Sequence, residues 1–253
     1  MLPFDDTGEG PAIVLVHAGI ADRSMWSEHL PALARGGHRA VAVDLPGFGE
    51  APESATAPWL AVLATMDELG IERAVLVGNS FGGAVALRVA ALAPERVRAL
   101  LLISAPPPDL EPSDALREVW RAEEEAYERG DIDGALEVVV AAWTLPDASP
   151  ELRVRIAAMQ RRAYEHGAAA GPYEEPLDPL EGDPSALTRL EMPALVAAGE
   201  RDMPDFRDGA VALAQAMPLA RHALIAGAGH LAPLETPDAF RALLLELLEG
   251  LDD

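Results

Sequence analysis

The stretch Val75-Leu-Val-Gly-Asn-Ser-Phe-Gly-Gly83 decides the fold of this chain. The apolar run from Ala74 to Val77 predicts a buried strand, and the run from Ala84 to Leu92 predicts a helix. Between them lies Gly78-Asn-Ser-Phe-Gly82, and a G-x-S-x-G sequence between a strand and a helix is typical of a nucleophile elbow. Ser80 is therefore the candidate nucleophile. The alternative is a glycine-rich turn in which Ser80 only caps the helix.

The residues around Ser80 suit such an elbow for two physical reasons. Glycine two positions before and two positions after the serine permits a turn that is too sharp for larger side chains. The helix that follows directs backbone N–H groups and the positive end of its dipole toward the serine. This arrangement stabilises negative charge that develops on a nearby oxygen.

Further strands and helices alternate on both sides of this unit. Buried strands are expected at residues 12–16, 39–43, 97–103, 194–198 and 221–226, and residues 2–10 have room for one short strand. Helices are expected at 22–35, 59–69 and 206–216, and a last helix begins with Thr236 as its N-cap. Strands that alternate with helices predict an α/β fold with a mostly parallel central sheet flanked by helices.

The alternation is interrupted between the strand at 97–103 and the strand at 194–198. Residues 109 to about 185 show no strand pattern and predict helices near 113–129, 132–143 and 150–166. We therefore expect a core made of residues 1–106 and 186–253, with an all-helical insertion at 107–185.

Composition excludes several classes of function. The 253 residues carry 42 acidic and 19 basic side chains and a formal net charge of −23, which argues against nucleic acid and anionic membranes as partners. The absence of cysteine excludes thiolate catalysis and disulfides. The N-terminal residues lack the basic start and the long apolar run of a signal peptide. No stretch approaches the ~18 to 20 unbroken apolar residues of a membrane span. We expect a cytoplasmic protein and leave its oligomeric state open.

Polar residues follow several of the expected strands. In parallel α/β sheets the site lies at the carboxyl ends of the strands, so these residues are expected at one edge of the sheet. They are His17, Asp44, Ser80, Asp202 and His230.

A serine hydroxyl needs a base within hydrogen-bond reach, and the base needs a carboxylate that orients it. His230 is the candidate base, because only two of the six histidines follow strands. Asp202 is the candidate acid, which gives the chain order Ser80, Asp202, His230. Asp109 is the alternative acid, and Asp44 is interpreted as structural within its glycine-rich loop.

The expected oxyanion hole uses backbone donors. One is the N–H of Phe81, the residue after the nucleophile, and the other is the N–H of Gly19 in the loop after the strand at 12–16. His17 is then interpreted as an organiser of that loop.

Taken together, these segments resemble the α/β-hydrolase superfamily over nearly the whole chain. His17-Ala-Gly-Ile20 resembles its oxyanion segment, and the other matching segments, in order, are Asp44–Gly49, Gly78–Gly82, Gly199–Asp202 and Gly229-His230. The resemblance implies that residues 107–185 form a helical cap over the site. Ala18 replaces the usual glycine, and the short N-terminus implies that one or both edge strands are missing or stunted.

We therefore expect a serine hydrolase that needs no metal or organic cofactor. It would cleave a carboxylic ester, lactone or thioester through an acyl-enzyme on Ser80. A serine at the elbow argues against the aspartate-based chemistry of dehalogenases and epoxide hydrolases in this fold. The aromatic residues expected to line a pocket for a small, largely apolar substrate are Trp120, Tyr127 and Trp143, with Tyr164 and Tyr173 as further candidates.

Two alternatives stay open at this point. The same triad would serve carbon–carbon bond hydrolysis or enol-lactone opening. A weakly catalytic ligand sensor of the same fold is the alternative from another class.

Overall fold

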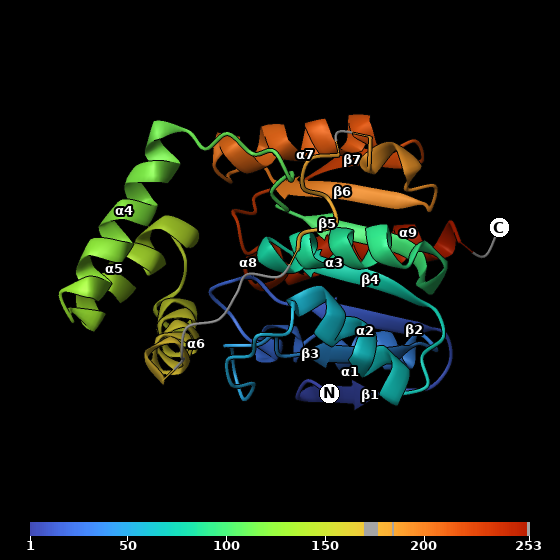
Figure 1. Cartoon of the computed structure of the whole chain (residues 1–253), viewed down its shortest axis with the longest axis horizontal. Coiled ribbons are helices and arrows are strands. Elements are labelled where there is room, and N and C mark those ends of the chain that lie inside the picture. Colours follow the sequence, from blue (N-terminus) through green and yellow to red (C-terminus); the bar gives the residue numbers. More distant parts are fainter. Residues whose placement is uncertain (170–176, 184, 252–253) are drawn as a thin grey trace.

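The computed structural model describes residues 1–169, 177–183 and 185–251, and its centre is a mostly parallel sheet. Among these residues the strand order is β1-β3-β2-β4-β5-β6-β7 (Figure 1). The strands are β1 (Phe4–Thr7), β2 (Ala12–Val16), β3 (Arg39–Val43), β4 (Ala74–Asn79), β5 (Val97–Ile103), β6 (Ala194–Gly199) and β7 (Ala220–Ile225). Every neighbouring pair is parallel except β1 with β3. The predicted α/β architecture is confirmed.

The N-terminal edge of the sheet is short, as the sequence predicts. The strand β1 has four residues and pairs antiparallel with β3, from Phe4 opposite Val43 to Thr7 opposite Ala40. On this edge the Arg39 guanidinium forms an ion pair with Asp6, with 2.7 Å between Nη2 and Oδ2. Charged side chains at an exposed edge discourage pairing with another chain.

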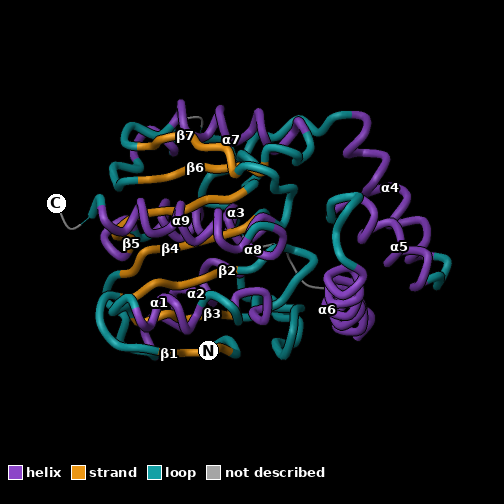
Figure 2. The backbone as a smooth tube through the Cα atoms, turned by 180° about the vertical axis from the view of Figure 1, so that it is seen from behind, coloured by secondary structure: helices purple, strands orange, loops and turns teal. Residues whose placement is uncertain are grey.

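Helices cover both faces of the sheet (Figures 1 and 2). One face packs against α2 (Pro58–Glu68), α3 (Phe81–Leu92) and α7 (Pro204–Ala216), and the other packs against α1 (Leu30–Arg35) and α9 (Pro237–Glu249). Successive side chains of a strand point to opposite faces, so Val14 and Val16 join the first layer while Ile13 and Leu15 join the second. All four are almost completely buried, which explains the uninterrupted apolar runs of the sequence.

Three helices lie together at the carboxyl ends of the parallel strands (Figure 1). They are α4 (Asp114–Glu128), α5 (Ile132–Trp143) and α6 (Pro150–Ala169), called here the three-helix segment. The side chain of Ser113 accepts a hydrogen bond from Leu116 N and caps α4, while Asp131 caps α5 by accepting from Gly134 N. These caps place the helix boundaries close to those predicted from the sequence.

The structure corrects the predicted helix at residues 22–35. The segment instead forms the 3-10 turn η1 (Arg23–Trp26) and the short helix α1. The Asp22 side chain accepts a hydrogen bond from Ser24 N and so begins a separate turn. Pro31 has no N–H to donate within a helix, so it stands in the first turn of α1 rather than in a helix interior.

Thr236 stands at the N-cap of α9, but its hydroxyl does not cap the helix. It donates instead to Ala232 O, at 3.2 Å, in a short helix α8 (Ala232–Glu235) that the sequence analysis did not predict. Two further 3-10 turns are η2 (Pro94–Arg96) and η3 (Leu187–Arg189).

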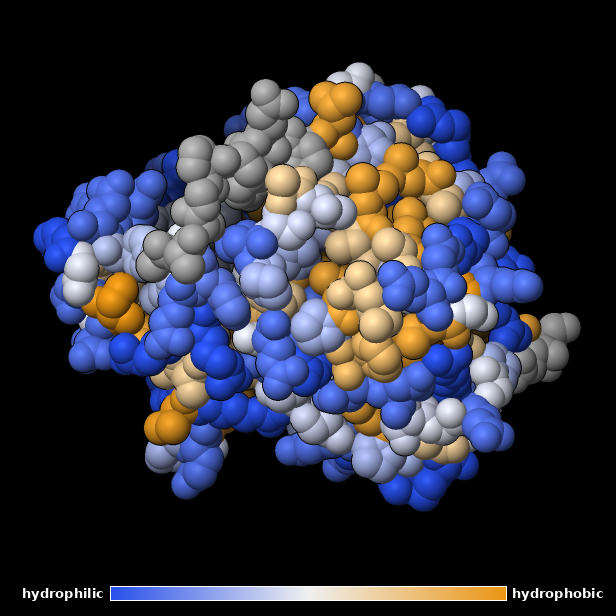
Figure 3. Space-filling model, turned by 60° about the horizontal axis from the view of Figure 1, so that its bottom comes forward, coloured by the Kyte–Doolittle hydropathy of each residue, from blue (hydrophilic) through white to orange (hydrophobic). Residues whose placement is uncertain are grey.

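The surface is unevenly apolar. On the face seen in Figure 3, hydrophilic residues cover most of the left-hand part, and hydrophobic residues gather on the right-hand part. None of the helices in the described part of the chain has the length and apolar character needed to cross a membrane.

Candidate active site

The turn between β4 and α3 holds Ser80 in a strained backbone conformation. Its φ is 54° and its ψ is −118°, in a region that residues other than glycine rarely adopt. The Ser80 side chain makes no capping hydrogen bond to α3, so the structure does not support the interpretation of this serine as a simple helix cap. Strain at a strand-to-helix turn is what a nucleophile elbow requires.

The glycines around Ser80 allow three chain segments to approach one another closely. A Cβ at Gly78 would lie 2.3 Å from the carbonyl oxygen of Gly82. A Cβ at Gly82 would lie 2.2 Å from Val16 O and 2.5 Å from His17 O. The start of α3 therefore packs directly against the end of β2, where the candidate oxyanion loop begins.

The candidate base and acid are hydrogen-bonded to each other. Nδ1 of His230 lies 3.0 Å from Oδ1 and 3.1 Å from Oδ2 of Asp202, and both residues are buried. Because a carboxylate only accepts, Nδ1 carries the proton and Nε2 of the neutral ring is left as an acceptor. Asp202 is oriented in turn by Met203 N, which donates to its Oδ1 at 2.7 Å.

Two aromatic rings hold the imidazole of His230 from different parts of the chain. The ring of Trp143, at the end of α5, lies 4.6 Å from it between centroids, and the ring of Phe206 in α7 lies 4.3 Å from it. Trp143 also contacts Phe206 edge-on at 5.7 Å. The three-helix segment therefore touches the candidate base directly.

Asn79 links the turn that carries Ser80 to the loop that carries His230. Its Nδ2 donates to His230 O at 3.0 Å and to Ile103 O at 3.1 Å. No role was predicted for Asn79, which is the variable position before the serine in G-x-S-x-G. The signal in the sequence was an amide just after a strand expected to be buried, and the partner of that amide depends on the fold.

The two residues that carry the candidate oxyanion donors, Gly19 and Phe81, lie side by side. A Cβ at Gly19 would be 3.3 Å from Cβ of Phe81. Both residues line a cavity of about 370 Å³, whose other lining residues are Pro46, Phe48, Glu53, Ser54, Thr56 and Pro58. The structure thus places a cavity with apolar and polar lining residues beside the two residues that carry the expected N–H donors.

His17 joins two loops at the carboxyl edge. Its Nε2 accepts from Leu45 N at 2.9 Å, and its Nδ1–H donates to Ala18 O at 2.8 Å. Complete burial lowers the pKa of His17, which keeps the ring neutral and in this tautomer. These bonds fit the predicted role of a loop organiser, and both ring nitrogens are already used.

Asp44 bonds within its own loop, as predicted from the sequence, and it also has Arg23 as a partner. It accepts from Glu50 N at 2.8 Å within its own loop. It also accepts from Arg23 N at 2.7 Å and forms an ion pair with the Arg23 guanidinium. Its carboxylate is fully buried and satisfied, as a structural residue requires.

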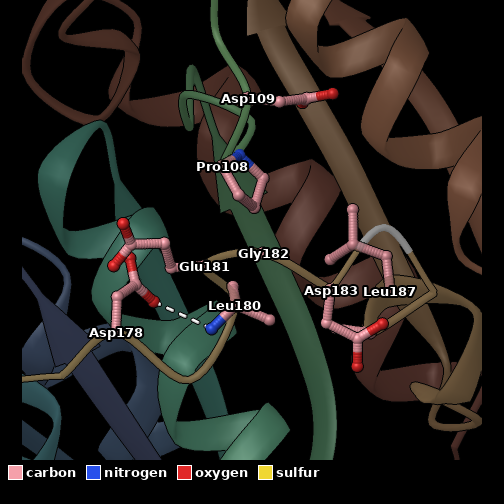
Figure 4. Close-up of a pocket in the computed structure, with 9 residues that line it drawn as sticks. Pro108, Asp109, Asp178, Leu180, Glu181, Gly182, Asp183 and Leu187 are labelled. Atoms are coloured by element: carbon pink, nitrogen blue, oxygen red, sulfur yellow. Dashed lines mark hydrogen bonds between the residues drawn. The ribbon is translucent and has the colours of Figure 1, made fainter.

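Asp109 lies in a different environment from Asp202. It lines a cavity of about 510 Å³ between the loop after β5 and residues 178–183 and 186–187 (Figure 4). Figure 4 shows Asp178 and Glu181 at the same cavity, and Asp178 accepts a hydrogen bond from Leu180 N at 2.9 Å. Since both short contacts of His230 Nδ1 go to Asp202, the geometry favours Asp202 as the acid.

Of the candidate aromatic residues, the structure brings Trp143 to the site. Trp120 is 43% exposed on α4, and Tyr127 packs on Tyr164 within the three-helix segment, with 4.8 Å between ring centroids. Tyr173 lies outside the described residues. Substrate contacts by Trp120 and Tyr127 stay a prediction.

No cluster of three or more His, Cys, Asp or Glu side chains is arranged to hold a metal ion within the described ranges.

A family model described as the alpha/beta hydrolase fold matches residues 11–237. The chain belongs to this family. Among curated relatives, it is 29% identical over 260 residues to 2-hydroxymuconate semialdehyde hydrolase of Pseudomonas sp. strain CF600, covering 98% of this chain and 90% of that protein. With three longer relatives it aligns over only 29%, 20% and 23% of their length.

Solved structures of the family show the same fold. A thermophilic esterase from Thermogutta terrifontis superposes with a TM-score of 0.80 and 29% identity, over 99% of this chain and 93% of that one. The enol-lactonase of Burkholderia xenovorans LB400 gives a TM-score of 0.80 and 25% identity, over 98% and 96%. These likenesses show that the chain is an α/β hydrolase and leave its substrate open.

Proposed function

We propose that this α/β hydrolase cleaves a carboxylic ester through an acyl-enzyme on Ser80. The observation that carries the proposal is the bond from His230 to Asp202, at the same edge of the sheet as the strained turn that holds Ser80. A serine hydroxyl becomes a nucleophile at neutral pH when a histidine accepts its proton and a carboxylate orients that histidine. Lactones and thioesters present the same reacting carbonyl and fall within the proposal.

The proposed reaction has two steps. Oγ of Ser80 attacks the carbonyl carbon while Nε2 of His230 accepts the hydroxyl proton, and the oxyanion accepts hydrogen bonds from Gly19 N and Phe81 N. The leaving alcohol departs with the proton from His230. A water molecule then gives a proton to His230 and attacks the acyl carbon. The bond from the acyl carbon to Oγ breaks, His230 returns the proton to Oγ of Ser80, and the acid is released.

The proposed substrate is small and largely apolar. The cavity beside Gly19 and Phe81 has a volume of about 370 Å³, and its lining combines Phe48 and two prolines with Glu53, Ser54 and Thr56. Trp143 covers His230 from the three-helix segment, which we propose acts as the cap of the site. Apolar groups beside an acidic side chain favour an uncharged acyl or alcohol group over an anionic one.

A second candidate function is supported by the comparisons. A full-length relative is named as a 2-hydroxymuconate semialdehyde hydrolase and one structural neighbour as an enol-lactonase. Carbon–carbon bond hydrolysis and enol-lactone opening would use the same three side chains. The distinction lies in the substrate and not in the triad.

The test is hydrolysis of a short-chain p-nitrophenyl ester by the wild type and by variants. Ser80→Ala and His230→Ala are expected to lose about 1000-fold or more in kcat. Asp202→Asn should lose at least about 100-fold, whereas its matched control Asp109→Asn should keep wild-type activity.

A ring-cleavage diketone and an enol lactone, assayed in parallel, separate the second candidate from the first. Higher kcat/KM on either of these than on the ester would favour the second candidate. If the wild type hydrolyses none of them and no serine-directed reagent labels Ser80, the enzyme proposal is wrong.

A further inference from the structure

One carboxylate outside the proposed triad joins the three-helix segment to the histidine loop. Glu235 ends the short helix α8, five residues after His230. Its Oε1 accepts a hydrogen bond from Leu145 N at 2.9 Å, just beyond α5. Its Oε2 accepts from Gly229 N at 2.8 Å, the residue before His230. Each oxygen therefore serves a different segment of the chain.

The packing at this point is tight and specific. A Cβ at Gly229 would lie 2.9 Å from Cδ2 of Leu145 and 3.0 Å from Oε2 of Glu235. The Leu145 side chain therefore rests directly on the backbone of the histidine loop. Two residues earlier, the Trp143 ring lies against the His230 ring at 4.6 Å. The end of α5 thus touches the histidine loop through a side-chain ring, a leucine and the Glu235 carboxylate.

The chemistry of the bridge requires a carboxylate. Both of its partners are backbone N–H donors, so both oxygens must accept. A glutamine has one carbonyl oxygen and one NH₂ group, and its NH₂ would face one of the two N–H groups. Glu235 is partly buried, and this burial raises its pKa, while the hydrogen bonds from Leu145 N and Gly229 N act in the opposite direction.

We propose that Glu235 is a positioning residue that fixes the place of His230 relative to the three-helix segment. This inference rests on the proposed function, because His230 is there the general base. A shift of the end of α5 would move Leu145, and the Glu235 carboxylate would transmit that shift to Gly229 and the adjacent histidine. A misplacement of about 1 Å in a catalytic group costs about 100-fold in rate, so a bridge of this kind affects kcat more than substrate binding.

The test compares Glu235→Gln and Glu235→Asp with the wild type in ester hydrolysis. Rates are expressed per active site, counted by titration with a serine-directed phosphonate, so that loss of folded protein does not enter kcat. Glu235→Gln is expected to lower kcat roughly 10- to 100-fold with KM changed less than about threefold. Glu235→Asp keeps the charge but is one methylene shorter, so it should lose a similar factor.

The matched control is Glu200→Gln. The Glu200 carboxylate accepts from Gly227 N at 3.0 Å, two residues before Gly229 on the same loop. The same acid-to-amide change there removes a carboxylate from this loop without touching Leu145, and the amide oxygen of the glutamine can still accept from Gly227 N. Its kcat per titrated site is expected to stay within about twofold of the wild type.

Amide hydrogen exchange provides a readout that is independent of catalysis. The Leu145 and Gly229 amides should exchange faster in Glu235→Gln than in the wild type or in Glu200→Gln. Unchanged exchange, or a kcat per titrated site within about twofold of the wild type for Glu235→Gln, would overturn the inference. Wild-type kcat in Glu235→Asp would overturn it as well. If the wild type is neither active nor labelled, the proposed function fails, and exchange alone decides whether Glu235 joins the two segments.

Discussion

A buried histidine away from the proposed triad makes the stability of the fold depend on pH. His29 is 1% exposed between Trp26, Phe240 and α8. Its Nε2–H donates to Pro233 O at 3.0 Å, and its Nδ1 accepts from the Arg241 guanidinium at 3.3 Å. A second proton on the ring would face that guanidinium. Burial, with a contribution from Arg241, lowers the pKa of His29 to about 4.

The sign of the effect follows from proton binding. Below pH ~6.5 the unfolded chain protonates this histidine, while the folded protein does not until the pH approaches 4. The free energy of unfolding therefore falls by about 1.4 kcal/mol for each pH unit as the pH drops through this window. The total is about 3 kcal/mol, and it is fully present above pH ~6.5.

Urea unfolding of wild type and His29→Gln at pH 7 and pH 4.5 measures this contribution. Glutamine keeps a donor near the position of Nε2 and does not titrate. The wild type should lose about 2 kcal/mol more than His29→Gln between the two pH values. His222→Gln, at an exposed position on β7, is the control and should keep the wild-type pH dependence. Equal losses in wild type and His29→Gln would refute the argument.

Two further predictions concern the architecture of the proposed site. In Gly82→Ala the new Cβ would lie 2.2 Å from Val16 O, so we expect a loss of about 3 kcal/mol in urea unfolding and about 100-fold in kcat. Gly130→Ala, where nothing lies within 4 Å but φ is +74°, should cost only about 1 kcal/mol and leave kcat unchanged; equal costs for the two would contradict the packing argument. Asp44→Asn removes the buried charge that pairs with Arg23 and should cost about 3 kcal/mol in the same assay. A cost below about 1 kcal/mol would show that Arg23 is satisfied without Asp44.

Much of the fold is readable from the sequence because strands buried on both faces leave an uninterrupted apolar pattern. The runs 12–16 and 97–103 correspond to strands with the same bounds. The prediction failed at residues 22–35, where apolar spacing indicated one helix and the Asp22 cap and Pro31 divided it into two. Local capping chemistry overrode the periodicity there.

A site residue can be predicted from the sequence where it must follow a strand. It cannot be predicted where it acts through a contact with a residue far away in the sequence. The positions of Ser80, Asp202 and His230 follow from the carboxyl-edge rule for parallel sheets. The bridge from Glu235 to Leu145 spans 90 residues, and the bond from Asn79 to His230 O spans 151. No periodic pattern encodes such pairs, because they depend on how separate loops meet in the fold.

The central claim is that Ser80 is a nucleophile activated by His230. The most direct measurement is covalent labelling of the folded protein with a fluorophosphonate, followed by mass spectrometry of the peptide that contains Ser80. It requires no knowledge of the substrate. We expect rapid, stoichiometric labelling at Ser80 in the wild type and labelling at least about 100-fold slower in His230→Ala. Absence of labelling in the wild type, or equal labelling rates in both proteins, would contradict it.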